Sequence, residues 1–433
     1  MKKLAINGGP KIRNKLFPAY KVIDAKEIKA VRKVLESGTL SKFLGCWSPD
    51  FYGGLQVQAF EKEWARYFNV KNAIAVNSCT SGLYCAIGAC GIGPGEEVIV
   101  SPLTMSATAT SILIFNAIPV FADIEENYFC LDPKSIRERI TKRTKAIMVV
   151  DIFGQPYAAE EINKIAKENN LFVIEDCAQA PYAKYKGRYA GTLADIGVYS
   201  LNYHKHIHTG EGGIVVTDND KLAEKIRLIR NHAEAVAGDK GVKDLVNMIG
   251  FNFRMTEIEA AIGRCQLPKL KSLVEKRIEN ANYIAEKLGK LPGIISPALR
   301  EKCVNVYYVQ AFKYKEEIVG VSRDKFIEAV RAELSPTEFR EKEGVRIGVG
   351  NGEPLYLQPI YQNLIGYGKK GCPFKCPLYK GRPRYARGIC PITERINYKE
   401  LFVHDLMHAS MKKKDLDDVV RAFEKVYFLR KTI

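Results

Sequence analysis

Short apolar runs alternate with amphipathic segments between residues 60 and 220. Seven runs predict β-strands, at Ala73–Asn77, Glu97–Ser101, Ile118–Ala122, Ala146–Val150, Phe172–Glu175, Ile196–Leu201 and Gly213–Thr217. Helical spacing of apolar positions, as in Ser81–Cys90 and Ala159–Asn169, fills the gaps between the first five runs. This alternation predicts a mostly parallel sheet covered by helices on both faces. Because ligands bind at the carboxyl ends of such strands, the residues that follow each strand are the candidates for a functional site.

The pattern changes in the last third of the chain. A long amphipathic stretch from Thr256 to Leu288 predicts helices that leave the sheet domain. Beyond it, residues 304–314 are β-rich, and residues 323–334 and 414–428 have helical patterns. Residues 344–391 are rich in Gly, Pro and Tyr and predict long ordered loops. We therefore predict an α/β fold with an N-terminal arm and large domain at residues 1–274, and a smaller C-terminal α/β domain at residues 275–433.

Composition places the protein in a cellular compartment. Apolar residues make up 46% and charged residues 27% of the 433 residues, as in soluble globular proteins. No apolar stretch approaches the ~18 residues that span a bilayer, and the N-terminus lacks the apolar run of roughly 7–15 residues of a secretory signal. Most of the eleven cysteines sit in apolar runs, where a free thiol packs as a small hydrophobe. We expect a cytoplasmic protein without a membrane partner.

The net charge and the cysteine spacing add little information about the function. The 66 Lys and Arg against 49 Asp and Glu give a net charge of +17, which suits anionic small molecules or nucleic acid alike. The basic residues are spread along the chain without a nucleic-acid motif, so we expect no nucleic-acid partner. Cys372, Cys376 and Cys390 have partly metal-like spacing but lack a second ligand pair. A packed cysteine cluster is the favoured interpretation over a structural metal, and we expect no metal.

The first candidate site is Asn-Ser-Cys-Thr-Ser-Gly at residues 77–82, directly after a predicted strand. Hydroxyl side chains, here including Thr80 and Ser81, and free backbone N–H groups at a helix N-terminus can bind an anion. The same residue types also form an ordinary helix cap.

The second candidate is the acidic pair Glu175-Asp176, which ends a strand of apolar residues. Asp176 then lies at the carboxyl edge of the sheet, where an unpaired carboxylate is costly. Either a cationic ring nitrogen of a ligand or a structural arginine can satisfy it.

The third candidate is Lys205, which lies between two predicted strands and ahead of a glycine-rich turn. Burial or neighbouring cationic histidines lower the pKa of a lysine and expose its neutral amine for Schiff-base formation. Metal binding is the rival interpretation for His204, His206 and His208. In extended structure these three histidines fall on one side and Lys205 on the other.

Together the three candidates supply what pyridoxal 5'-phosphate (PLP) requires. Its phosphate needs an anion site, its pyridine nitrogen a carboxylate, and its aldehyde a lysine. A carboxylate keeps the ring nitrogen protonated, so the ring can accept electrons when a proton leaves the substrate. A lysine displaced by substrate can then move that proton.

Several motifs resemble the DegT/DnrJ/StrS family of PLP-dependent sugar aminotransferases. They are Ser-x₄-Lys-x₄-Gly-Glu-Gly-Gly at 200–213, Glu-Asp-x-Ala-Gln-Ala at 175–180, Gly-Ile-Gly-Pro-Gly-Glu-Glu-Val-Ile-Val at 91–100, Gly-Phe-Asn-Phe-Arg-Met at 250–255, and the opening Ile-Asn-Gly-Gly-Pro at 6–10. The resemblance covers nearly the whole chain, and the lysine follows the Glu-Asp aspartate by 29 residues.

The resemblance implies an aspartate-aminotransferase type fold (PLP fold type I) and a homodimer with shared active sites. It implies that Lys205 holds the cofactor and that Asp176 pairs with its ring nitrogen. It implies the remaining cofactor contacts as well, namely the ring hydroxyl (Gln179), one ring face (Ala178) and the phosphate (Thr80, Ser81 and Ser200, with Asn252 of the partner subunit). Two positions depart from the family pattern. Met105 replaces an aromatic residue that stacks on the cofactor, and Cys79 replaces a glycine.

We therefore expect an aminotransferase that alternates between PLP and its amine form (PMP). Its expected substrates are glutamate or glutamine as donor and a keto sugar, nucleotide-linked, or a keto cyclitol as acceptor. Related sugar dehydratases replace the lysine with histidine, so His204 beside Lys205 keeps that alternative open. A regulatory or nucleic-acid-binding protein with the same fold is a third alternative, which only the basic charge supports.

Overall fold

The computed structural model describes residues 3–433, and its centre is a seven-stranded sheet. In chain order the strands are β1 (Asn72–Val76), β2 (Glu97–Val100), β3 (Ile118–Phe121), β4 (Thr144–Val150), β5 (Phe172–Asp176), β8 (Ile196–Ser200) and β9 (Gly213–Thr217). Their spatial order is β1-β9-β8-β5-β4-β2-β3. The strands from β8 to β3 run parallel, whereas β9 is antiparallel to both of its neighbours. The prediction of a mostly parallel sheet with these seven strands is confirmed.

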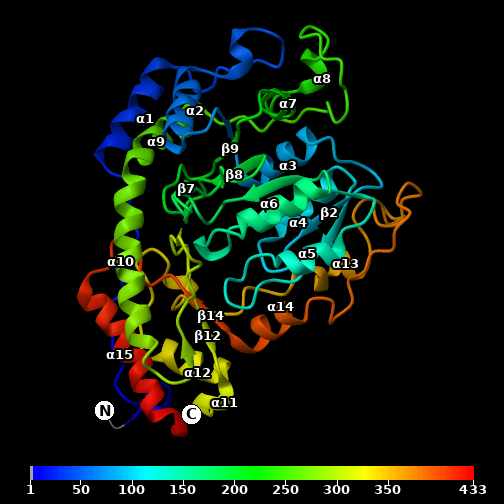
Figure 1. Ribbon diagram of the computed structural model, residues 1–433. Helices are drawn as coiled ribbons and strands as arrows, with labels where there is room; N and C mark the ends of the chain where they lie inside the picture. Colours follow the sequence, from blue (N-terminus) through cyan, green and yellow to red (C-terminus); the bar gives the residue numbers. More distant parts are fainter. Residues whose placement is uncertain (1–2) are drawn as a thin grey trace.

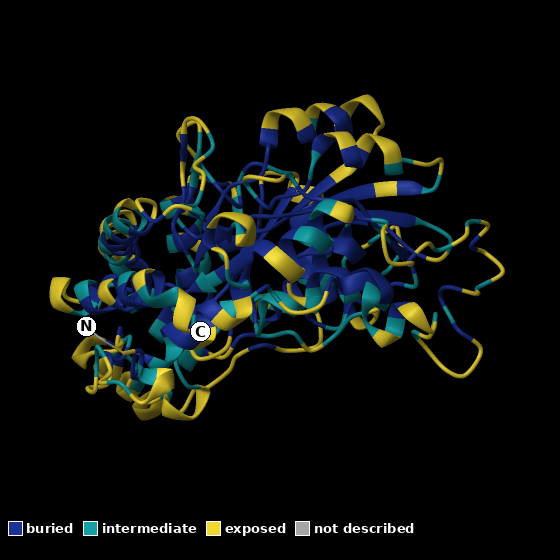
Figure 2. Cartoon of the chain, turned by 90° about the horizontal axis from the view of Figure 1, so that it is seen from below, coloured by how far each residue is buried: buried dark blue, intermediate teal, exposed yellow. Residues whose placement is uncertain are grey.

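Helices cover both faces of this sheet. They are α2 (Leu55–Phe68), α3 (Cys79–Ala89), α4 (Ser106–Ile114), α5 (Pro133–Arg139), α6 (Ala159–Glu168), α7 (Asp220–Arg230) and α9 (Glu257–Gln266). Alternate residues of a strand point to opposite faces, so Ile147 packs into one hydrophobic core and Met148 into the other. Figure 2 shows the central strands buried, with exposed surface on the outer sides of helices and in loops.

Helix α2 shows how the sequence selects one of these faces. Val57, Phe60, Trp64 and Phe68 recur at intervals of three or four residues and are all buried. This spacing puts them on one side of the helix. The Trp64 and Phe68 rings stack with centroids 4.8 Å apart. The apolar side of α2 is thereby fixed against the sheet.

The second part of the chain begins with a long helix. Figure 1 shows α10 (Leu270–Leu288) running from the large sheet towards the C-terminal elements. There β10 (Ile294–Ile295), β12 (Gln310–Tyr314), β14 (Leu401–His404) and β13 (Ile347–Val349) form a second sheet. In the same picture α12 (Arg323–Ala332) and α15 (Lys413–Leu429) lie at the same end of α10 as this sheet, whereas α1 (Ala25–Ser37) lies at the opposite end. The predicted boundary between residues 274 and 275 falls inside α10, and the domain division stays a prediction.

Smaller elements complete the chain. A three-stranded sheet consists of β11 (Cys303–Val304), β6 (Lys184–Tyr185) and β7 (Arg188–Tyr189). Short helices are α8 (Ala233–Val236), α11 (Glu316–Val319), α13 (Pro359–Gln362) and α14 (Pro391–Arg395). Within residues 3–433, every helix is too short or too polar to cross a lipid bilayer.

The chain between residues 354 and 390 returns to the large sheet and packs beside β3. This returning segment is mostly loop, as predicted, and runs at one end of the sheet in Figure 1. The Tyr385 hydroxyl donates to the Pro119 carbonyl of β3 over 2.8 Å. The rings of Phe121 and Tyr361 lie 5.3 Å apart. The segment therefore covers an edge strand that precedes it by more than 200 residues.

Candidate active site

A cavity of about 210 Å³ lies at the carboxyl ends of the parallel strands. It is lined by seven of the nine predicted site residues: Thr80, Met105, Asp176, Ala178, Gln179, Ser200 and Lys205. These residues come from the connections after β1, β2, β5 and β8, which are separate in sequence and meet at one edge of the sheet. The structure thus brings the three candidate motifs together in one place.

Asp176 ends β5 at the inner wall of this cavity and is 5% exposed. Thr108 on α4 donates its hydroxyl to Asp176 Oδ2 over 2.8 Å, and the Ala178 N–H donates to Oδ1 over 3.2 Å. Burial raises the pKa of the carboxyl group, while the two hydrogen bonds and the charge of Lys205 lower it. A buried carboxylate of this kind gains from a cationic partner.

Lys205 belongs to the loop between β8 and β9 and is 8% exposed. Two backbone bonds close this loop, from Leu201 N–H to Gly212 O (2.9 Å) and from Thr209 N–H to Leu201 O (3.0 Å). The Lys205 Nζ atom lies 4.2 Å from the centre of the Tyr308 ring. Burial lowers the pKa of the amine, opposed by Cys79 and Asp176. The loop therefore presents an amine that is more easily deprotonated than a surface lysine.

The alternation expected for the neighbouring histidines is wrong. Residues 203–207 form turns and bends, because the N–H of Lys205 donates to Asn202 O over 2.9 Å. His206 is 1% exposed, with Nε2 3.0 Å from Val306 O, whereas His204 lines the cavity. No group of three or more potential ligand side chains in residues 3–433 is arranged to hold a metal ion.

Another wall of the cavity is formed by the start of α3. Ser78 caps this helix, since its Oγ accepts from the Ser81 N–H over 3.0 Å, and the Ser81 hydroxyl donates to Asn77 Oδ1 over 2.6 Å. Ser81 is thus engaged in the cap and does not line the cavity. Thr80 and Ser200 do line it, so hydroxyl groups and the helix N-terminus face the space where an anion can bind.

Three further predicted site residues differ in their hydrogen bonds and in their position relative to the cavity. Gln179 Oε1 accepts from the Phe153 N–H over 2.7 Å, which leaves the Nε2 donor for the cavity. Met105 is 64% exposed at the start of α4, where its sulfur accepts from the Ala107 N–H. Asn252 lies outside this cavity and accepts from Arg254 Nε over 2.7 Å. Its predicted role is in the site of the partner subunit.

Sequence reasoning missed Thr108 and Tyr308. Thr104 and Thr108 lie four residues apart after β2, and this spacing of hydroxyl groups on a post-strand helix was an available signal for Thr108. Nothing local to Tyr308 indicates that it packs on Lys205, which precedes it by 103 residues. Sequence reasoning also gave no role to Glu175. Its carboxylate accepts from the Gly191 N–H (2.6 Å) and the Leu193 N–H (3.0 Å) and so fastens a turn.

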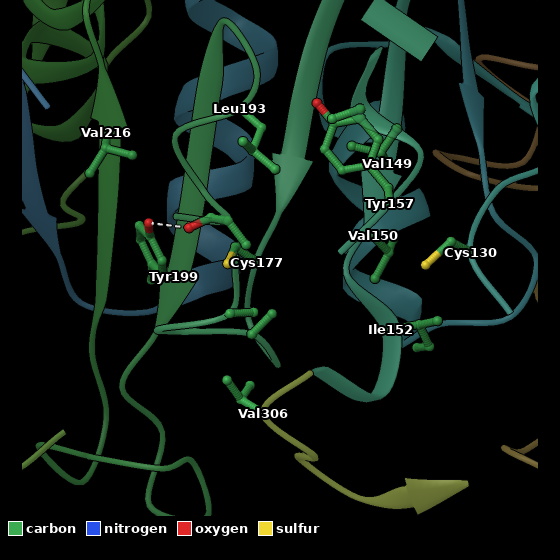
Figure 3. Close-up of a cluster of buried hydrophobic side chains, with 14 of the residues drawn as sticks. Cys130, Val149, Val150, Ile152, Tyr157, Cys177, Leu193, Tyr199, Val216 and Val306 are labelled. Atoms are coloured by element: carbon green, nitrogen blue, oxygen red, sulfur yellow. Dashed lines mark hydrogen bonds between the residues drawn. The ribbon is translucent and has the colours of Figure 1, made fainter. Parts of the chain in front are cut away.

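A packed apolar cluster supports the site. Figure 3 shows Val150 of β4, Tyr199 of β8 and Val216 of β9 converging on it, with Val306 approaching from the chain that precedes β12. The Tyr199 hydroxyl donates to the Ala190 carbonyl over 2.6 Å. Close packing of this kind fixes the strand ends that carry the site.

Comparison with known proteins decides the family. The model of the DegT/DnrJ/EryC1/StrS aminotransferase family matches residues 21–374. The chain belongs to this family. The resemblance noted in the sequence is therefore confirmed.

Individual relatives match over almost the full length. The chain is 34% identical over 418 residues to the spore coat polysaccharide biosynthesis protein SpsC of Bacillus subtilis (strain 168), covering 95% of this chain and 97% of that protein. It is 29% identical over 449 residues to the L-glutamine:2-deoxy-scyllo-inosose aminotransferase of Micromonospora echinospora, covering 99% and 98%. The X-ray structure of the aminotransferase from Psychrobacter cryohalolentis superposes with a TM-score of 0.80 at 28% identity, covering 95% and 99%.

These matches establish the class of enzyme. The chain is a PLP-dependent aminotransferase of fold type I, as predicted. The cavity fits this cofactor, because a buried carboxylate, a buried lysine and the hydroxyl groups at a helix N-terminus line the same space. The family assignment and the geometry of the cavity therefore indicate the same cofactor.

Proposed function

We propose that this aminotransferase moves an amino group from glutamate or glutamine to a keto sugar, nucleotide-linked, or to a keto cyclitol. The observation that carries the proposal is the buried amine of Lys205 in the same cavity as the carboxylate of Asp176. The similarity to a glutamine-dependent cyclitol aminotransferase and to a spore coat polysaccharide protein supports these substrate classes. The net charge of +17 suits an anionic acceptor.

In this proposal each residue of the cavity has a role towards the cofactor. When bound, PLP supplies an aldehyde that holds the amino group and a ring that takes up electrons as the substrate C–H bond breaks. The hydrogen bonds from Thr108 and Ala178 favour the charged form of Asp176, which would hold the proton on the ring nitrogen. The Gln179 Nε2 group donates to the ring hydroxyl. Ala178 and Met105, which both line the cavity, would contact the two faces of the ring.

The phosphate end and the proton transfer complete the assignment. Thr80 and Ser200 donate to the phosphate, with Asn252 of the partner subunit, so the active site requires a homodimer. Ser81 orders this end indirectly, through the cap of α3. Lys205, whose pKa is lowered by burial, would move a proton from the donor carbon to the cofactor, and would make the reverse transfer in the acceptor reaction.

Two measurements test the proposal. The PMP form is mixed with a panel of keto sugar nucleotides and keto cyclitols, and return of the absorbance of the aldehyde form reports an acceptor. Borohydride reduction of the PLP form, followed by peptide mapping, should place the cofactor on Lys205. The Lys205→Ala variant should lose this link, whereas Lys186→Ala, at an exposed lysine outside the cavity, should keep it.

The outcomes separate the alternatives. If no keto sugar or cyclitol restores the aldehyde form, the acceptor class is wrong. Cofactor that binds without a covalent link, together with loss of a sugar hydroxyl, would indicate the dehydratase. His204, which precedes Lys205 in sequence and lines the same cavity, is the candidate residue for that reaction. Salt-sensitive binding to duplex DNA by protein without a chromophore would favour the regulatory alternative.

A further inference from the structure

A second cavity, of about 280 Å³, lies beside the Lys205 loop. His204 lines both cavities, and Tyr308, whose ring packs against the Lys205 amine, lines the second one. Its other walls come from the N-terminal arm, helix α10 and the small sheet with its flanking loops. The second cavity is thus separated from the amine of Lys205 by a single layer of side chains.

The floor of the second cavity holds an unusual buried cation. Arg277 of α10 is 4% exposed. Its Nη1 donates to the carbonyls of Tyr307 (3.1 Å) and Tyr308 (3.0 Å), while its Nε has no hydrogen-bond partner. No ion pair within residues 3–433 includes this arginine. A buried guanidinium without a carboxylate is costly, and an anionic ligand would offset that cost.

Of the two carboxylates that line the second cavity, Asp405 pairs with an arginine, whereas Glu338 forms no ion pair within residues 3–433 and accepts from the Ala19 N–H over 3.4 Å. Arg340 forms a two-pronged pair with Glu343, with both N–O distances 2.6 Å. Arg346 pairs with Asp405 over 2.7 Å. Overall the lining contains four basic side chains, Lys21, Arg277, Arg340 and Arg346, against the carboxylates of Glu338 and Asp405. Neither Lys21 nor Arg277 forms an ion pair within residues 3–433, although the charge of Arg277 opposes the rise that burial causes in the pKa of Asp405.

Other buried side chains without a hydrogen-bond partner also line the second cavity. His408 is 4% exposed, and neither of its ring nitrogens has a hydrogen-bond partner. Burial lowers its pKa to about 3, so the ring is neutral and can donate one N–H. The Nη1 of Arg346 also lacks a partner. Buried polar atoms are almost always hydrogen-bonded. Four side chains around this cavity have polar atoms without a hydrogen-bond partner, which indicates a ligand: His204, Arg277, Arg346 and His408.

We propose that the second cavity binds a carboxylate of the amino donor, with Arg277 as its ionic partner and His408 as a neutral hydrogen-bond donor. This proposal rests on the proposed function. A guanidinium matches a carboxylate with two parallel hydrogen bonds. The volume of about 280 Å³ is below the ~300–1,000 Å³ typical of sites for drug-sized ligands, so it suits a small amino acid better than a nucleotide-linked sugar. Because His204 lines both cavities, a donor whose carboxylate is held in the second cavity lies next to the cofactor cavity, where its amine has to react.

The test uses the PLP-loaded protein and separates donor from acceptor. Binding of succinate, a dicarboxylate without an amine, is measured by calorimetry. Conversion to the PMP form by glutamate or glutamine, and its reversal by the acceptor, are followed separately by absorbance. Arg277→Met should weaken succinate and donor binding about 10- to 100-fold and leave the acceptor constant unchanged. Arg277→Lys should restore only part of the binding affinity for succinate and the donor, because an ammonium group lacks the planar pair of N–H donors of a guanidinium.

A matched control is Arg331→Met. Arg331 also donates to a backbone carbonyl, that of Ile347 over 2.6 Å, but does not line the second cavity. It should bind succinate and the donor like the wild type. If Arg277→Met does not fold, His408→Leu serves instead, with an expected loss of about 3- to 10-fold for one neutral hydrogen bond.

The results discriminate clearly. Unchanged dissociation constants for succinate and the donor in the Arg277 and His408 variants would overturn the proposal. A loss of rate or affinity confined to the acceptor reaction would also overturn it. Uridine diphosphate competing with succinate in an Arg277-dependent manner would also overturn it. If neither amino acid converts the wild type, the proposed function fails. The succinate titration then still shows whether Arg277 binds a carboxylate.

Discussion

The hydroxyl group of Thr108 donates to Oδ2 of Asp176 over 2.8 Å, and both side chains are buried. Thr108 lies on α4 and Asp176 at the end of β5, so this bond joins the helix after one strand to the tip of another. The Thr108 hydroxyl also lies 3.1 Å from that of Thr104. Asp176 is therefore held in one orientation by a residue 68 positions before it.

Thr108→Val should weaken the binding of PLP about tenfold or more. A hydrogen bond to a charged group contributes about 1.5–3 kcal/mol, and valine keeps the shape without the donor. Because the bond lowers the pKa of Asp176, its removal raises that pKa, and the loss should be larger at pH 6 than at pH 8. Fluorescence titration of the apoprotein with PLP measures the effect. Ser111→Ala is the control, since its hydroxyl donates only within α4 and to a sulfur; equal losses in both variants would contradict the argument.

Tyr308→Leu should change the pH dependence of cofactor capture. The aromatic face stabilises the charged amine of Lys205 by about 0.5–2 kcal/mol. Its loss lowers the pKa of the amine further, so more neutral nucleophile is present. At pH values where the wild-type amine is still protonated, the apoprotein should capture PLP about 2- to 30-fold faster. Stopped-flow absorbance measures this rate. Tyr308→Phe keeps the ring and should behave as the wild type.

Met105→Tyr should tighten the binding of PLP. Met105 lines the cavity and is exposed, at a position where the family resemblance implies an aromatic residue. Aromatic contacts contribute about 0.5–1.5 kcal/mol beyond burial, which corresponds to about 2- to 10-fold in affinity. Met105→Leu removes the sulfur without adding a ring and provides the comparison. Identical dissociation constants for the tyrosine and leucine variants would show that no ring stacks there.

Asp151→Asn should stabilise the protein at alkaline pH. Asp151 is fully buried near Glu175, and burial together with the Glu175 charge raises its pKa well above the ordinary value. The folded protein then holds a proton at pH values where the unfolded chain has lost it, so stability falls as pH rises through that window.

The asparagine variant is neutral at every pH and should remove this loss. We expect its free energy of unfolding to exceed that of the wild type at pH 8. Thermal melts between pH 5 and 8 should decline less than those of the wild type. Asp239→Asn, at an exposed position, should not alter the wild-type decline. A parallel decline in Asp151→Asn would show that this carboxyl group is not the cause.

The sequence predicted what local pattern determines. The seven strands follow from short apolar runs, and Thr80, Asp176 and Lys205 follow from their positions after strands. Thr108, Tyr308 and Arg277 reach the cavities from other elements, and their contacts depend on packing between segments far apart in the chain. The alternation expected around Lys205 failed for a similar reason. The pairing of Leu201 with Gly212 closes that loop, and a turn then forms inside it.

The returning segment imposes an order on folding. Ribosomes add roughly 5–20 residues per second, so the strand containing Pro119 emerges tens of seconds or less before Tyr385 arrives to cap its carbonyl. Until then the edge of the nascent sheet at β3 is exposed and prone to aggregation, as unpaired strand edges are. Newly made chains should therefore require chaperone protection during that interval. Truncation before residue 354 would make the exposure permanent and drive the protein into inclusion bodies.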